Sequence, residues 1–105
     1  MTTCSVIIVN PLGLHARAAA RFVHVASGFT ASSRVGRGPR EMDGKSIMGL
    51  LLLSASQGTT VTITADGADE AQAIEALCDL VRRGFDETPL DAVRGTAFDG
   101  AQGKP

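Results

Sequence analysis

The feature that most constrains this chain of 105 residues is an abrupt change of pattern near residue 12. The run Val6–Val9 is β-branched throughout, which is typical of a strand. The run Ala16–Ala26 places apolar side chains at the spacing of one helix face. Between them, an Asn-Pro pair and a glycine interrupt regular backbone structure. The sequence therefore predicts a strand, a short loop and a helix, with His15 standing at the helix entrance.

His15 and Arg17 carry the chemistry that this position favours. The first turn of a helix has unpaired backbone N–H groups and a partial positive charge, so it attracts phosphate. A guanidinium can bind two phosphate oxygens at once, and an imidazole is a nucleophile near neutral pH. A histidine at a helix start is also a common polar cap or surface residue, and His15 alone does not separate these roles. Together with Arg17 and Gly13, it indicates an anion site.

The remaining patterns extend this unit to a complete small domain. The expected strands are Cys4–Val9, Phe29–Val35, Arg40–Asp43 and Thr60–Ala65, with a hairpin turn at Gly36–Pro39. The expected helices are Ala16–Ser27, a short one from Ser46 to Leu53, and a long one after Asp69. Asp69 is expected to cap the long helix, with Gln72 completing a capping box. This helix is expected to end in a Schellman motif at Gly84-Phe85. The order β-α-β-β-α-β-α predicts an α+β fold, with helices on one face of a mostly antiparallel sheet. This domain covers residues 1–87, and residues 88–105 are expected to form a disordered tail.

Composition and charge narrow the functional class. The chain has no Trp or Tyr and no apolar run of the ~20 residues that span a membrane, so we expect neither nucleic-acid binding nor membrane insertion. No signal peptide is visible, and a cytoplasmic location follows as the expectation. Residues 1–46 carry a net charge of +4 and residues 47–105 carry −5. The half with His15 is therefore suited to an anionic group or an acidic protein partner.

The sequence does not support a nucleotide-binding loop or a metal site. The segment that ends in Gly44-Lys45-Ser46 lacks the upstream glycine of a nucleotide-binding P-loop, because Pro39 stands in that place. A metal between His15 and His24 lacks a third ligand nearby in the sequence. Cys4 and Cys78 have no metal-binding spacing and are expected to be free thiols.

The segment Ser46–Leu53 has more large apolar residues than one buried stripe can hide. Ser46 is a good N-cap for a helix of about two turns. Some of the apolar side chains that follow must face outward, and an exposed apolar patch often marks a docking surface. The sequence therefore also allows a regulatory docking module that acts through this surface.

Two motifs resemble one known family. The run Gly-Leu-His-Ala-Arg-Ala-Ala at residues 13–19 resembles the active-site signature of the histidine-containing phosphocarrier (HPr) family of the bacterial phosphoenolpyruvate-dependent phosphotransferase system. Residues 44–48, Gly-Lys-Ser-Ile-Met, resemble its second motif. The resemblance covers residues 1 to about 87 and implies an open-faced sandwich of four strands and three helices. It departs from the family pattern at Ala18, where proline is usual, and three successive alanines there resemble the nitrogen-related branch rather than the sugar-transport branch.

The resemblance implies a carrier rather than an enzyme. His15 would accept a phosphoryl group from phospho-enzyme I and pass it to an enzyme IIA protein. Arg17 would steady the phosphoryl oxygens, and the backbone N–H groups of Ala16 and Arg17 would hold the anion. No metal and no organic cofactor are implied, and the carrier is expected to be a monomer.

The resemblance also implies a regulatory site and a docking surface. Ser46 would be phosphorylated where the matching HPr kinase/phosphorylase is present. The partner-docking positions implied for this chain are Ala20, His24, Ile47, Met48 and Leu51.

Overall fold

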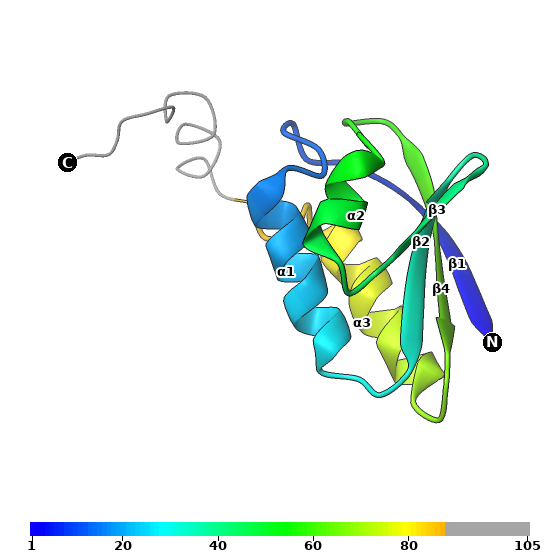
Figure 1. The fold of residues 1–105 in the computed structure, drawn as a ribbon. Coiled ribbons are helices and arrows are strands. Elements are labelled where there is room, and N and C mark those ends of the chain that lie inside the picture. The colour runs from blue at the N-terminus through cyan, green and yellow to red at the C-terminus, as the bar shows by residue number, and fades with distance from the viewer. Residues whose placement is uncertain (88–105) are drawn as a thin grey trace.

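The computed structural model describes residues 1–87, which form strands and helices in the predicted order (Figure 1). The strands are β1 (Thr2–Ile7), β2 (Ser32–Arg37), β3 (Arg40–Asp43) and β4 (Thr60–Asp66). The helices are α1 (Ala16–Ser27), α2 (Ile47–Leu52) and α3 (Glu70–Arg82). The tail predicted for residues 88–105 lies outside the described residues.

The four strands form one sheet in the order β1-β4-β2-β3, with every neighbouring pair antiparallel. The helices all cover the same face of this sheet (Figure 1). The core lies between the two layers and includes Phe22, Ile63 and Leu77. The predicted α+β open-faced sandwich is confirmed.

The other face of the sheet is lined with hydroxyl side chains. Thr3 and Thr64 approach each other across β1 and β4 with Oγ1–Oγ1 at 3.3 Å, and Ser5 and Thr62 do so at 3.4 Å. Cross-strand hydroxyl pairs of this kind support a sheet without apolar burial. This face is therefore mostly polar around these pairs, with Ile7 exposed at the end of β1.

Strand boundaries differ from the prediction because partner strands determine them. β1 runs from Thr2 to Ile7 instead of Cys4–Val9, since it pairs with β4 from Thr2↔Ala65 to Ile7↔Thr60. β2 begins at Ser32 instead of Phe29 and continues through Arg37, so the hairpin turn shortens to two residues. Local pattern carries no information on such pairing.

The capping box expected at Asp69 is wrong. Asp69 precedes α3, but its side chain makes no cap hydrogen bond. Its carboxylate instead accepts hydrogen bonds from the backbone N–H of Thr30 at 2.9 Å and of Ala31 at 2.8 Å. These bonds, that from Thr30 foremost, hold the pKa of Asp69 below its ordinary value. Asp69 therefore fastens the turn between α1 and β2 rather than its own helix.

The end of α3 forms the predicted Schellman motif. Gly84 has φ +71°, its N–H donates to the Val81 carbonyl at 2.9 Å, and the Phe85 N–H donates to the Leu80 carbonyl at 2.9 Å. The chain then turns toward α1, where Nη1 of Arg21, in the middle of the helix, donates to the Phe85 carbonyl at 2.7 Å. The end of α3 is thus held against α1.

Candidate functional site

The loop before α1 is held in one conformation by Asn10 and Gly13. The Gly13 N–H donates to the Asn10 carbonyl at 3.0 Å, and Nδ2 of the buried Asn10 donates to the Gly13 carbonyl at 2.8 Å. Gly13 has φ +68°, and a Cβ there would lie 2.7 Å from the carbonyl oxygen of Ala55. That same oxygen accepts the Leu14 N–H at 2.8 Å. The loop therefore delivers His15 to a fixed place.

His15 is the N-cap of α1. Its backbone is extended, with φ −83° and ψ 179°, and its Nδ1 accepts the backbone N–H of Arg17 at 3.3 Å. Because Nδ1 is an acceptor, the neutral ring carries its proton on Nε2. The prediction that His15 stands at the helix entrance is confirmed, and its Nδ1 lone pair faces the N–H groups of the first turn.

The other ring nitrogen of His15 faces a carboxylate. His15 Nε2 lies 3.5 Å from Oε1 of Glu87 without a hydrogen bond between them, and Nε2 is buried. The Glu87 side chain is only 6% exposed, against 24% for His15. Oε1 of Glu87 also accepts Nδ2 of Asn10 at 2.7 Å. Asn10, His15 and Glu87 therefore form one cluster.

Sequence reasoning missed Glu87 and the role of Asn10. Glu87 is the last residue of the predicted domain, and nothing in its neighbourhood distinguishes it from other surface acids. Its position depends on how the turn after α3 returns to α1, which is tertiary structure. The only usable signal was the Schellman stop, which ends α3 just before this residue.

The remaining α1 residues implied by the resemblance lie on one exposed stripe, the α1 stripe, comprising Ala16, Arg17, Ala20 and His24. Residues three and four apart share a helix face. The structure therefore places Ala20 and His24 along the helix from the site, on the surface that a partner approaching His15 would meet.

The short helix α2 exposes an apolar surface beside α1. Ser46 caps it, with Oγ accepting the Gly49 N–H at 3.0 Å, as the sequence predicts. The exposed side chains, here named the α2 patch, are Ile47, Met48 and Leu52. Leu51, expected to face outward, is half-buried against the core, and Leu52 takes its place at 55% exposure. α1 packs against α2, so the α1 stripe and the α2 patch are on adjacent helices (Figure 1).

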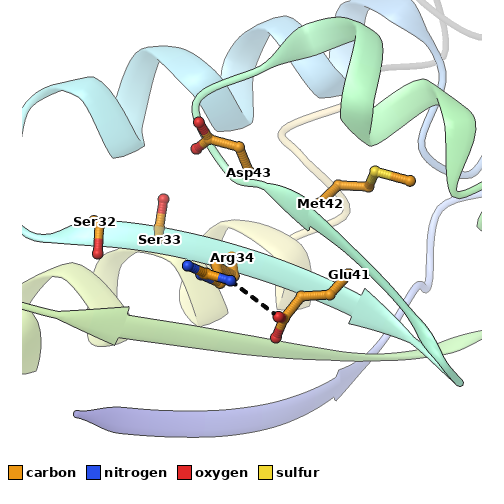
Figure 2. Close-up of a pocket in the computed structure, with 6 residues that line it drawn as sticks. All are labelled: Ser32, Ser33, Arg34, Glu41, Met42 and Asp43. Carbon is orange, nitrogen blue, oxygen red and sulfur yellow. Dashed lines mark hydrogen bonds and ion pairs between the residues drawn. The ribbon is translucent and has the colours of Figure 1, made fainter.

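A separate open pocket of about 310 Å³ lies between β2 and β3. Figure 2 shows its lining, in which Arg34 and Glu41 form an ion pair at 3.3 Å and the buried Ser33 points inward. None of its lining residues was predicted as a site residue, and none belongs to the cluster around His15.

The described residues offer neither a metal-binding cluster nor a membrane-spanning helix. Within residues 1–87, no three His, Cys, Asp or Glu side chains gather closely enough to hold a metal ion. None of the helices in this part of the chain is both long and apolar enough to cross a membrane.

Comparison with known proteins bears directly on this geometry. A family model described as "PTS HPr component phosphorylation site" matches residues 2–83. The phosphocarrier protein HPr of Pseudomonas aeruginosa is 46% identical over 88 residues, which cover 83% of this chain and 98% of that protein. The phosphocarrier protein NPr of Shewanella violacea is 42% identical over 82 residues, covering 78% and 90% respectively.

A crystal structure of HPr from Thermoanaerobacter tengcongensis superposes with a TM-score of 0.80 at 43% identity, covering 84% of this chain and 99% of that one. The sequence match and the structural match therefore point to the same family, and each covers more than three quarters of the chain. The chain belongs to the HPr family, and it is a phosphocarrier protein of the phosphotransferase system rather than an enzyme.

Proposed function

We propose that His15 is the phosphoryl acceptor and that its Nδ1 is the reacting atom. The observation that carries this proposal is the contact of Nδ1 with the Arg17 N–H at the start of α1. An anion at that position meets backbone donors that already point toward it. Of the two histidines in the chain, only His15 stands at a helix N-terminus, since His24 lies in the last turn of α1.

The transfer step follows from the ring's protonation. Nδ1 bonds to phosphorus while the bond between phosphorus and phospho-enzyme I breaks, and the electron pair of that bond returns to the donor. The Arg17 N–H, released from Nδ1, then donates to a phosphoryl oxygen together with the Ala16 N–H, and the Arg17 guanidinium adds charge stabilisation. Such positioning is most of what phosphoryl transfer needs. The same steps in reverse pass the group to an enzyme IIA protein.

Glu87 supports this role because the ring becomes positively charged when Nδ1 is phosphorylated. Nε2 keeps its proton throughout, so the positive charge develops next to the buried Glu87 carboxylate, which lies 3.5 Å away. A carboxylate that balances the positive charge developing on a histidine is a recurring device in catalytic sites. Asn10 holds this carboxylate in place through its 2.7 Å hydrogen bond.

The α1 stripe and the α2 patch are the surface that we assign to the partners. An enzyme I or IIA protein that reaches Nδ1 must cover the start of α1, and the α2 patch lies beside it. We place this exchange in the cytoplasm, with the carrier acting as a monomer.

We also propose Ser46 as a regulatory phosphorylation site at the edge of this surface. Its Oγ is half-buried in the cap of α2, and a phosphate there would add about −2 charge beside the α2 patch. Acidic partner surfaces would then bind more weakly. Ser46→Asp should raise the Kd for enzyme I without unfolding the chain, and Ser46→Thr, which keeps a capping hydroxyl, should not.

The decisive experiment incubates the chain with enzyme I and phosphoenolpyruvate and measures its intact mass before and after mild acid. We expect one acid-labile phosphate on the wild type and on His24→Ala, and none on His15→Ala. Nitrogen-15 NMR of the phosphorylated ring should identify Nδ1 as the bonded atom. A phosphate that survives in His15→Ala would overturn the assignment. A folded wild type that takes no phosphate would favour the docking module that acts through Ser46–Leu53.

A further inference from the structure

Two cysteines that phosphoryl transfer does not use lie on facing elements. Cys4 is on β1, and its side chain points to the helix side of the sheet together with Thr2 and Val6. Cys78 is on the buried face of α3 and is 2% exposed. α3 packs directly on β1. The two thiols therefore meet in the layer between the sheet and α3.

Arg82 confirms how close Cys4 lies to this face of α3. Nη2 of Arg82 donates to Sγ of Cys4 at 3.6 Å. Cys78 precedes Arg82 by one helical turn, so both side chains leave α3 on the same side. The neighbouring Cys4 thiol also helps to raise the pKa of Cys78. Two sulfurs and one guanidinium are thus gathered between β1 and α3.

The two sulfurs are not equivalent. Cys4 is half-exposed, whereas burial, followed by the neighbouring Cys4 thiol, raises the pKa of Cys78 to about 12. A reagent in solution therefore reaches Cys4 first, with the Arg82 guanidinium beside it to stabilise negative charge on sulfur. Cys78 stays protonated behind it.

We propose that Cys4 and Cys78 form a redox site that reduces a hydroperoxide and closes to an intramolecular disulfide. The Cys4 sulfur attacks the terminal peroxide oxygen, the O–O bond breaks, and the rest of the peroxide leaves as water or an alcohol. Cys4 is then a sulfenic acid.

The Cys78 sulfur next attacks the Cys4 sulfur. The Cys4 oxygen leaves with the Cys78 proton as water, so two thiols have given up two electrons to one peroxide. Disulfides that form in this reversible way are typical of redox sensing in reducing compartments.

The location connects this site to the phosphoryl site. β1 leads into Asn10, and α3 leads through the Schellman turn into Glu87. A disulfide joins these two elements upstream of the residues that contact His15.

The test treats the full chain with hydrogen peroxide and follows its intact mass. We expect the wild type to lose two hydrogen masses as a monomer, to regain them with dithiothreitol, and to yield a linked peptide pair that contains Cys4 and Cys78. Cys78→Ala should instead gain one oxygen that dimedone traps on Cys4, and Cys4→Ser should gain none.

The contribution of Arg82 to the rate of disulfide formation can be tested against Arg83 as a matched control. Arg82→Gln should slow disulfide formation roughly tenfold, because it removes the cation beside the attacking sulfur. Arg83→Gln, which removes an arginine that pairs with Asp79 and Asp86, should leave the rate unchanged. Stable Cys4 oxidation in the wild type without a disulfide, or a disulfide between two chains, would refute the pairing.

Discussion

Glu87 and His15 stand at opposite ends of the described chain, yet their side chains face each other at 3.5 Å. The contact exists because the Schellman turn at Gly84 directs the end of α3 toward the start of α1. An acid at the end of one element thus completes a site whose recognisable motif lies entirely at the start of another.

The first prediction concerns the charge on Glu87. Glu87→Gln keeps an oxygen that can accept the Nε2 proton but loses the charge that balances the phosphorylated ring. We expect the rate of phosphorylation by enzyme I to fall roughly tenfold, which corresponds to about 1.4 kcal/mol of transition-state stabilisation. Rapid-quench assays with phospho-enzyme I measure this rate.

The adjacent acid supplies the control for this prediction. Asp86→Asn makes the same charge change one residue away, but Asp86 bonds Arg83 rather than His15. Its phosphorylation rate should match the wild type. Equal slowing in both variants would mean that overall charge, and not the contact with Nε2, matters. Glu87→Ala should additionally let the neutral ring populate the Nδ1–H tautomer, visible by nitrogen-15 NMR.

The second prediction concerns the loop at Gly13. Gly13→Ala places a Cβ at positive φ and within 2.7 Å of the Ala55 carbonyl, so we expect a loss of at least about 2 kcal/mol in the free energy of unfolding. Gly38→Ala has a similar φ of +59° but meets no atom within 4 Å, and it should cost only about 1 kcal/mol. Urea unfolding compares the two, and equal costs would show that the Ala55 contact is relieved by a shift of the loop.

The third prediction concerns pH and Asp69. Its pKa is lowered on folding, so the stabilisation it gives is complete above its ordinary value near 3.8 and is lost as the pH falls below it. Asp69→Asn should therefore be less stable than the wild type at pH 7, and this gap should close in acid. Glu75→Gln, which removes an exposed carboxyl of the same helix, is the control for the loss of one negative charge. Urea midpoints at pH 7 and below pH 3 give the comparison.

The fourth prediction concerns Ala18 in the first turn of α1. The backbone N–H groups of that turn have no carbonyl partner within the helix. Proline at this position therefore loses no helical hydrogen bond, and it lowers the conformational entropy of the unfolded chain. Ala18→Pro should add about 0.4–1 kcal/mol of stability. Ala20→Pro removes a helical hydrogen bond and should cost about 3 kcal/mol. A lower melting temperature for Ala18→Pro would show that its fully buried site has no room for the ring.

Sequence reasoning succeeded where the determinants are local. The position of His15 at a helix start follows from residues 10–17 alone, and the Ser46 cap follows from the pattern after it. Sequence reasoning failed where groups distant in the sequence form hydrogen bonds with a side chain in place of its local partners. Asp69 has the right neighbours for a capping box, but the N–H groups of Thr30 and Ala31 bind its carboxylate instead.

The same limit explains the exchange of Leu51 and Leu52. Both lie in one apolar run, and only the rotation of α2 against the core decides which is buried. Because α2 has fewer than two turns, its own periodicity does not fix that rotation. The contact between Glu87 and His15 likewise requires the whole path of α3.

The hydroxyl-lined face of the sheet is a suitable site for attaching a label or a surface linker. Thr3, Ser5, Thr62 and Thr64 lie on the face that no helix covers. A fluorophore or surface tether attached at Ser5 would thus leave His15, the α1 stripe and the α2 patch open to visiting proteins. Single molecules immobilised through this face would allow individual phosphorylation and phosphoryl-transfer events to be recorded.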